Sequence, residues 1–292
     1  MLLLGFNALQ EEVLNAQLNG GKQSKHGLIL NALMTGVVES FQGKYFGNNE
    51  AANVWTISAG ASIDKDLEPY YLQGSSQEFA VRVSDTTAVT TAGILDASVA
   101  GDRGYLRLSL RDVNGKAAMA LTQENVRWIA PLTSFTAVFD IAKWTTSAYG
   151  KTISFFEIGV MGTQGTIANI TDAAKEPGDG NPFIAVQFSS NTGILRVRSA
   201  ASATVVTGSS FVLPDPSTQA FTVRIEYKYN PKTASGYSIL FVNDQKIGGV
   251  PGMVTGPFQI FVRACHGASY VAATHTPIVV DVDSIICSVP RS

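Results

Sequence analysis

Nine consecutive residues, Phe221–Tyr229, alternate between apolar and polar side chains without a break. The apolar set consists of Phe221, Val223, Ile225, Tyr227 and Tyr229. Successive side chains of a β-strand point to opposite faces, so this segment has one apolar face and one face suited to water. Antiparallel sheets commonly leave one face in solvent, whereas parallel sheets are usually covered on both. The alternation therefore predicts an all-β, antiparallel sandwich.

Strand-like segments recur along most of the chain. The other predicted strands are residues 79–84, 105–111, 117–121, 135–141, 153–161, 183–188, 194–199, 237–242, 258–265 and 278–287. Asn114-Gly115 stands between two of them and predicts a hairpin, because both central residues of a type I′ turn need a positive φ. Asn243-Asp244 predicts a second turn, after residues 237–242. The long connection over residues 162–181 contains Pro177, Gly178 and Gly180, and we expect it to be a mobile or binding loop.

Residues 1–35 differ from the rest. Asn7 and Gln10 form a capping-box-like pair at the start of a predicted helix, and Gly20-Gly21 ends it. Apolar residues of this segment that fall on one helical stripe are Phe6, Leu9, Val13, Leu14 and Leu18. The stripe either covers the sandwich or docks onto another subunit. We therefore divide the chain into an N-terminal helical arm, residues 1–35, and a sandwich, residues 36–292, with the stripe as the expected assembly contact.

The composition excludes several classes of partner. Charged residues make up 15% of the 292 residues, below the roughly 25% typical of soluble domains, and the net charge is −2 with no basic cluster. We expect no nucleic-acid partner. Apolar Met1–Gly5 lacks a positive n-region and is soon followed by Glu11-Glu12, which does not fit a signal peptide. No apolar run approaches the ~20 residues of a membrane span, so we expect no membrane insertion. We expect the chain to be synthesised in a cytoplasm.

Several segments, taken in order, match the strands of a known fold. They are Glu39–Phe41, Val54–Thr56, Gly60–Ser62, Phe221–Tyr229 with Tyr237–Ile247, and the closing Val280–Ile286. This succession resembles the concanavalin A-like jelly roll shared by legume lectins and laminin-G-like modules. The resemblance implies an antiparallel sandwich over most of the chain. It implies little about function, because the fold hosts lectins, hydrolases and inert spacers.

A catalytic pair of carboxylates is not evident. The resemblance points to residues 155–161 as the strand that carries the two carboxylates in hydrolases of this fold, about 5–5.5 Å apart in retaining enzymes. Glu157 is the one acid in that strand, and a single carboxylate cannot serve as both acid and nucleophile. Asp281 and Asp283 share a strand face, but a solvated edge or a satisfied closing strand explains them better than catalysis. We expect no enzyme and no catalytic residues.

Metal sites are equally poorly supported. The two acidic loops that calcium would need contain Asp64, Asp66 and Glu68, and Asp172, Glu176 and Asp179. Neither has the interleaved Asp/Asn-Gly spacing of a dedicated calcium loop. The zinc-type donors are Cys265, His266, His275 and Cys287, but Cys265 and His266 are adjacent in a strand and point to opposite faces. We expect no cofactor or metal, and two free buried thiols, with a disulfide as the lesser alternative.

The remaining site candidates are aromatic rings, because a flat apolar face stacks on a sugar ring. Those in or near predicted loops are Tyr70, Tyr71, Trp144, Tyr149 and Tyr270, the possible glycan contacts. Most rings of a β-protein belong to its core.

Taken together, the sequence favours a non-enzymatic virion structural protein of a tailed bacteriophage: a capsid decoration, head-fibre or tail-associated subunit. Its partners would be other virion proteins and further copies of itself, and its location the virion. The alternative is a lectin-like adhesion module that binds a host-surface glycan.

Overall fold

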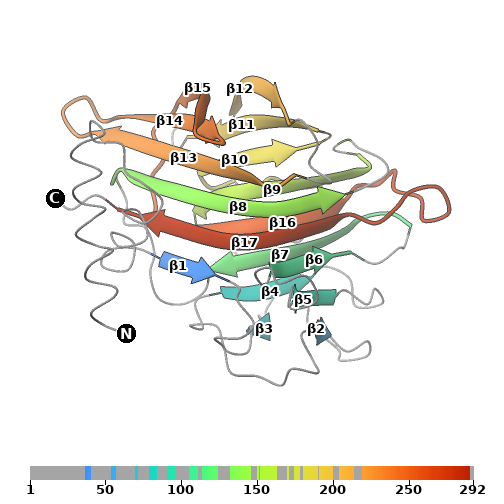
Figure 1. Cartoon of the computed structure of the whole chain (residues 1–292). Coiled ribbons are helices and arrows are strands. Elements are labelled where there is room, and N and C mark those ends of the chain that lie inside the picture. Colours follow the sequence, from blue (N-terminus) through green and yellow to red (C-terminus); the bar gives the residue numbers. More distant parts are fainter. Residues whose placement is uncertain are drawn as a thin grey trace, which may run out of the picture.

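The fold is an all-β antiparallel sandwich of two sheets (Figure 1). The computed structural model describes residues 37–40, 54–56, 70–71, 79–83, 91–95, 105–110, 114–123, 132–145, 150, 152–162, 170, 174–177, 180–189, 191–199, 204–213 and 219–289, with the backbone alone up to residue 107. The predicted helical arm of residues 1–35, with its five stripe residues, lies outside the described residues. Within them, no helix is long and apolar enough to cross a membrane.

The nine-stranded sheet has the order β15-β14-β13-β8-β17-β6-β5-β2, and β1 pairs with β17 beside this path. Its strands are β1 (Val37–Ser40), β2 (Val54–Thr56), β5 (Thr91–Leu95), β6 (Tyr105–Ser109), β8 (Phe135–Thr145), β13 (Phe221–Asn230), β14 (Ser235–Val242), β15 (Gln245–Pro251) and β17 (Val279–Ser288). All of its strand pairs are antiparallel.

The eight-stranded sheet has the order β12-β11-β10-β9-β16-β7-β4-β3. Its strands are β3 (Tyr70–Tyr71), β4 (Phe79–Val83), β7 (Ala117–Gln123), β9 (Ser154–Gly162), β10 (Phe183–Phe188), β11 (Thr192–Arg198), β12 (Val205–Val212) and β16 (Phe258–His266). It is antiparallel throughout as well.

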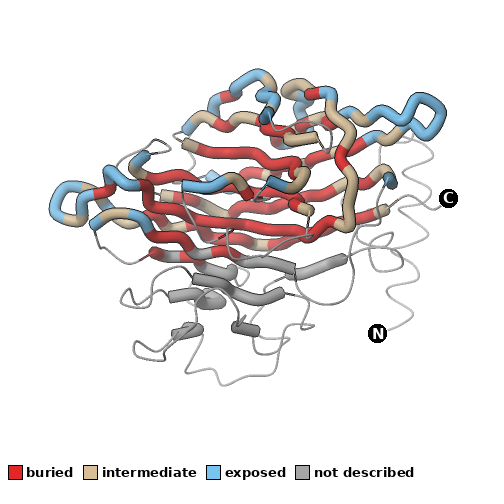
Figure 2. The backbone as a smooth tube through the Cα atoms, turned by 180° about the vertical axis from the view of Figure 1, so that it is seen from behind, coloured by how far each residue is buried: buried red, intermediate tan, exposed pale blue. Residues whose placement is uncertain are grey.

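The main core lies between the two sheets, where Figure 2 shows the long central strands buried. Inward residues of the central strands are two apart, as a period of two requires, except where the register of β8 with β17 shifts, after Ile141 and after Val282. The rings of Trp144 in β8 and Phe156 in β9 pack together with centroids 4.8 Å apart, and Phe156 stacks on Phe188 with centroids 4.3 Å apart. Burying such a side chain contributes about 1.5–3 kcal/mol. Aromatic packing across the sandwich therefore holds the two sheets together.

Strands β16 and β17 join two halves of the molecule. β17 lies between β8 and β6 in one sheet, and β16 lies between β9 and β7 in the other. On one side of these two strands stand β8 to β15, and on the other stand β2 to β7. The last strands of the sequence are therefore central in both sheets.

The alternating segment behaves as predicted. Phe221, Val223, Ile225 and Tyr227 of β13 are buried, while the residues between them are partly exposed. β14 pairs with both β13 and β15, and the turn after it is built by Asn243-Asp244 with φ of 48° and 62°. Positive φ at both positions is the signature of a type I′ turn, so this prediction is confirmed.

The hairpin predicted at Asn114-Gly115 is wrong. The strands on either side, β6 and β7, belong to different sheets, so the segment carries the chain across the sandwich. Gly115 does have a positive φ, of 88°. Its backbone N–H donates to Tyr270 O at 3.0 Å, and Asn114 Oδ1 accepts from Ala272 N at 2.8 Å. The local Asn-Gly signal fixes the backbone bend, but it does not choose the strands that pair.

The structure also has strands that were not predicted. β12 consists mostly of valine and small polar residues with no strict alternation, and β15 contains Gly248-Gly249, which weakens a strand signal. Tyr70-Tyr71, predicted in or near a loop, forms β3.

Candidate functional site

The outer face of the eight-stranded sheet, which is turned away from the other sheet, holds Glu157, for which no catalytic role was expected. Phe156, Ile158 and Val160 of β9 point into the main core. The intervening Phe155, Glu157 and Met161 therefore point to the outer face. They are nevertheless buried, as are Phe183 and Phe261 on neighbouring strands. The described side chains around Glu157 on this face are therefore buried rather than exposed.

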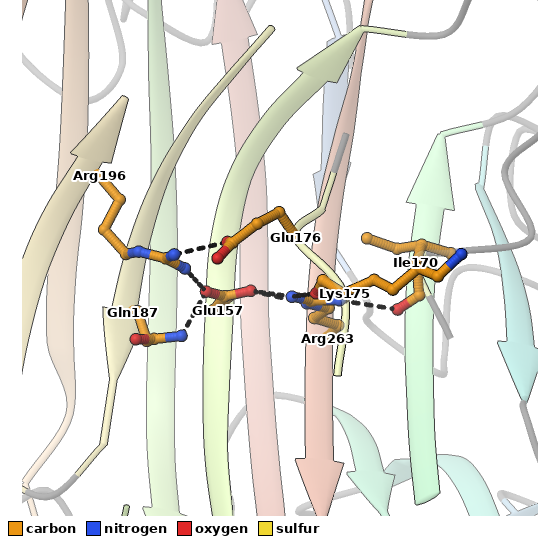
Figure 3. Close-up of polar contacts among 7 residues, drawn as sticks. All are labelled: Glu157, Ile170, Lys175, Glu176, Gln187, Arg196 and Arg263. Atoms are coloured by element: carbon orange, nitrogen blue, oxygen red, sulfur yellow. Dashed lines mark hydrogen bonds and ion pairs between the residues drawn. The ribbon is translucent and has the colours of Figure 1, made fainter. Parts of the chain in front are cut away.

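Glu157 is fully buried, and side chains from three other strands occupy both of its oxygens (Figure 3). Oε1 accepts from Gln187 Nε2 and from Arg196 Nη1, each at 2.6 Å. Oε2 accepts from Arg263 Nε at 2.7 Å, and Arg263 Nη2 lies 2.5 Å away. β10, β11 and β16 each supply one of these partners, so Glu157 ties together four adjacent strands.

The connection between β9 and β10 is tied to the same group. Arg196 Nη2 donates to Glu176 Oε2 at 2.5 Å. Arg263 donates to the backbone oxygens of Ile170, at 3.3 Å, and Lys175, at 2.9 Å. Ile170 itself is buried against the outer face. We refer to Glu157, Glu176, Gln187, Arg196 and Arg263 as the Glu157 cluster.

The charges of the Glu157 cluster balance, since two carboxylates face two guanidinium groups. Burial alone would lower the pKa of Arg263, but the charge of Glu157, with smaller effects from its other neighbours, more than offsets this and raises the pKa. Arg263 therefore remains a cation throughout the usable pH range. A buried, balanced and fully bonded group of this kind fastens the chain and leaves no oxygen of Glu157 exposed to a substrate.

The other acidic candidates do not join Glu157. Asp281 is buried in β17, in the other sheet, and the strand register places it opposite Lys143 and Arg107. Asp283 lies where the register of β17 with β8 shifts, and it is partly exposed. These surroundings fit the satisfied closing strand expected for the pair. Glu176 was predicted as a weak calcium candidate, and the structure assigns it to an ion pair with Arg196.

Among the described residues, no group of three or more His, Cys, Asp and Glu side chains is placed to hold a metal. The acidic candidates Asp64, Asp66, Glu68, Asp172 and Asp179 lie outside the described residues. Cys265 and Cys287 are buried free thiols, as expected. His266 Nε2 accepts from Ile278 N at 3.1 Å, and His275 Nδ1 accepts from Val271 N at 2.9 Å, so both rings serve the loop after β16.

Two of the predicted glycan contacts are wrong. Trp144 belongs to β8, which runs four residues beyond its predicted end, and its side chain is buried in the main core. Tyr270 does lie in a loop, but it is buried and stacks on His266, with ring centroids 3.6 Å apart. Tyr149 lies outside the described residues, and for Tyr70 and Tyr71 the structure describes the backbone alone.

The structure adds one aromatic residue that the sequence reading missed. Tyr237 of β14 is 42% exposed, and its ring lies directly above Gly249 of β15. Ile239 and Phe241 follow on the same outer face of the nine-stranded sheet, and the Arg224 guanidinium stacks on Phe241 at 3.7 Å. The alternation of residues 237–242 could have indicated this face. Because β15 was not predicted as a strand, the sequence did not show that Gly249 lies beneath Tyr237.

No protein-family model matches the chain, and no curated protein matches it. Solved structures resemble it in fold, and they are concanavalin A-like jelly rolls. One is the catalytic domain of an endo-1,3-β-glucanase (laminarinase) from Thermotoga petrophila RKU-1, with a TM-score of 0.49, 12% identity, and coverage of 80% of this chain and 95% of that one.

Two further similar structures are carbohydrate-binding or lectin-like by name. The metal-free carbohydrate recognition domain of Emp46p has a TM-score of 0.47 and 10% identity, over 79% of this chain and 97% of that one. A legume lectin-like domain from Entamoeba histolytica has a TM-score of 0.45 and 11% identity, over 76% of this chain and 96% of that one. The similar structures therefore include both hydrolases and lectin-like domains.

Proposed function

We propose that this chain is a non-enzymatic structural protein, a subunit of a larger assembly. The observation that supports this proposal best is the state of Glu157. The one acid of its strand accepts hydrogen bonds on both oxygens, has no exposed surface and lies beneath the connection that carries Ile170 and Glu176. A hydrolase needs a second carboxylate and room for a sugar chain at this place.

The assembly we propose is the virion of a tailed bacteriophage, with the chain as a capsid decoration, head-fibre or tail-associated subunit. The low charged fraction, 15%, suits a protein whose surface is largely covered by neighbours. The apolar stripe of the arm would supply the contact with the particle. Synthesis in the host cytoplasm would precede assembly.

Sedimentation tests the structural role. Particles from the source lysate are separated on a density gradient, and each fraction is blotted for this chain. We expect the chain to sediment with intact particles and to resist a high-salt wash, because an apolar contact is not screened by salt. Recovery of the chain only at the top of the gradient, as free protein, would contradict the proposal.

A second assay tests the absence of hydrolysis. Purified protein is incubated with β-glucans and galactans, and released reducing sugar is measured. We expect no release. Release that Glu157→Gln abolishes while it remains folded by circular dichroism, and that the matched variant Glu226→Gln retains, would restore the hydrolase interpretation.

Glycan binding is the second candidate function, and Tyr237 favours it. Its ring is exposed above a glycine, which leaves a flat apolar surface of the kind on which a sugar ring stacks. A glycan array with wild-type protein and Tyr237→Ala tests this candidate. Binding that Tyr237→Ala removes would support a lectin-like module, and an empty array would exclude the tested glycans.

A further inference from the structure

The described edge strands of the two sheets are not equally protected against pairing with another chain. β1, β2 and β3 are edges of only four, three and two residues. β15 carries Lys246 and ends in Pro251, and both residue types discourage a further strand. β12 is eight residues long and contains neither a charged residue nor a proline. Among the described strands, β12 is thus the edge best suited to accept a partner.

The side chains of β12 are also unusually open. Val212 is 66% exposed and Val206 is 44% exposed, while Thr207, Ser209 and Ser210 are exposed as well. One side of the strand pairs with β11, and the eight-stranded sheet ends at the other. β12 and β15 lie together at the upper end of the sandwich (Figure 1), where Val250 of β15 packs beneath Gly208. The inner face of β12 is therefore supported, and its outer edge is free of described strands.

A β-bulge in the middle of β12 divides it into two arms. The register with β11 jumps from Ile194↔Ser210 to Arg196↔Thr207, so β12 contains one extra residue around Gly208-Ser209. Val205 and Val212 are an odd number of residues apart, so in a regular strand they would point to opposite faces. Because of the bulge, both point to the outer face of the sheet. Val206 and Phe211 likewise both point inward, since their partners on β11 are Val197 and Gly193.

We propose that β12 pairs with β12 of a second copy of this chain, antiparallel and about a two-fold axis at the bulge. In the register that uses the whole strand, Val205 lies opposite the second copy's Val212, Val206 opposite Phe211, and Thr207 opposite Ser210. Each opposed pair points to the same face, which antiparallel pairing requires. The exposed valines are thereby covered by apolar partners, and two uncharged strands meet without repulsion.

This dimer rests on the edge strand alone and stands or fails separately from the proposed virion role. An isologous contact presents each substitution twice, once from each copy. Val212→Lys is therefore expected to weaken the dimer at least tenfold, because each new ammonium group would replace a valine that faces an apolar partner. Val271→Lys is the matched control, since Val271 is similarly exposed, at 41%, but lies in the loop between β16 and β17.

Sedimentation equilibrium of the full chain measures the association. We expect wild type and Val271→Lys to be dimers with the same dissociation constant, and Val212→Lys to be a folded monomer by circular dichroism. A monomeric wild type at tens of micromolar would overturn the proposal. Equal weakening by both lysine variants would overturn it too, because the contact would then lie elsewhere.

Cross-linking tests the register. A mixture of Thr207→Cys and Ser210→Cys chains is expected to form a disulfide-linked heterodimer under mild oxidation, and each variant alone much less. The native cysteines do not interfere, because both are buried. Equal cross-linking of the mixture and of either single variant would show a different register and overturn the proposed pairing.

Discussion

At the scale of single residues, Glu157 shows how an isolated acid can be structural. Its negative charge lies between Arg196 and Arg263, both of them buried. Removing one partner of a buried ion pair leaves the other charge without compensation in a medium of low polarity. The partners of Glu157 are 39 and 106 residues away in the sequence, so pattern reading found the acid but not the two cations.

Glu157→Gln is expected to lower the free energy of unfolding by about 3–5 kcal/mol, because two buried guanidinium groups lose their common anion. Glu226→Gln is the matched control. Glu226 is a strand residue paired with Arg224 and Lys228, but these side chains are partly exposed. Glu226→Gln should therefore lower the free energy of unfolding by less than about 1 kcal/mol. Urea unfolding of both variants measures the difference. Equal losses would contradict the structural role of the Glu157 cluster.

Cys287 gives the stability a pH dependence. Burial raises the pKa of its thiol to about 12, from 9.0. The unfolded chain therefore loses this proton first, and the contribution of Cys287, complete below pH 9, declines as pH rises toward 12. At pH 10 the loss should be about 1.4 kcal/mol. Urea unfolding at pH 8 and pH 10 tests this, and Cys287→Ala should lose correspondingly less between the two pH values.

Among the aromatic candidates, Trp144 illustrates a different limit of the sequence. The apolar alternation of residues 135–141 predicted a strand that ended before Trp144, whereas β8 continues to Thr145. Beyond Ile141, β8 passes through an irregularity in its register with β17, and this irregularity turns Trp144 rather than Lys143 toward the core. An error of this kind at the end of a strand is enough to reverse the interpretation of a candidate site.

At the scale of elements, turn sequences predicted the pairing only of strands that are adjacent in the sequence. The β13–β14–β15 meander pairs neighbours in sequence, and its Asn243-Asp244 turn was predicted. The Asn114-Gly115 signal was just as strong, but β6 and β7 pair with strands that come much later, β17 and β16. Pairing between distant strands leaves no mark in a short window of sequence.

Gly115→Ala tests the bend that replaces the predicted hairpin. Gly115 has a φ of 88°, which residues with a Cβ avoid, although an added Cβ would meet nothing within 4 Å. The expected loss of stability is about 1–2 kcal/mol, from the backbone alone. Gly248→Ala is the control, because a Cβ there is equally unobstructed and its φ is not positive. Thermal unfolding should separate the two, and equal melting temperatures would contradict this reason for a glycine at position 115.

At the scale of the whole molecule, deletion of residues 1–35 tests the arm. The deletion removes Phe6, Leu9, Val13, Leu14 and Leu18 and spares β1, which begins at Val37. We expect a folded, soluble sandwich that forms the β12 dimer but no longer sediments with particles. Gradient fractions and circular dichroism measure the two properties. An unfolded product would show that residues 1–35 belong to the core of the sandwich.

The overall class of fold was within reach of the sequence, because alternation is clear in strands such as β13 and strand-like segments recur along the chain, although β9, β10 and β16 are buried on both faces. Strand order was not, since β16 and β17 are inserted between strands made much earlier in the chain. The resemblance to a jelly roll predicted the succession of strand segments. It did not predict that side chains from neighbouring strands bury Glu157 on the outer face. That burial depends on contacts across four strands, from β10 and β11 to β9 and β16.

The central position of β16 and β17 has a consequence for biosynthesis. β9 ends at Gly162 and β16 begins at Phe258, so a ribosome adding about 5–20 residues per second needs roughly 5 to 20 s between them. Throughout that interval, β8 lacks its neighbour β17 and β9 lacks its neighbour β16. A chain that ends before Phe258 has two separate parts of each sheet with no strand between them, so neither sheet can close until β16 and β17 have been made.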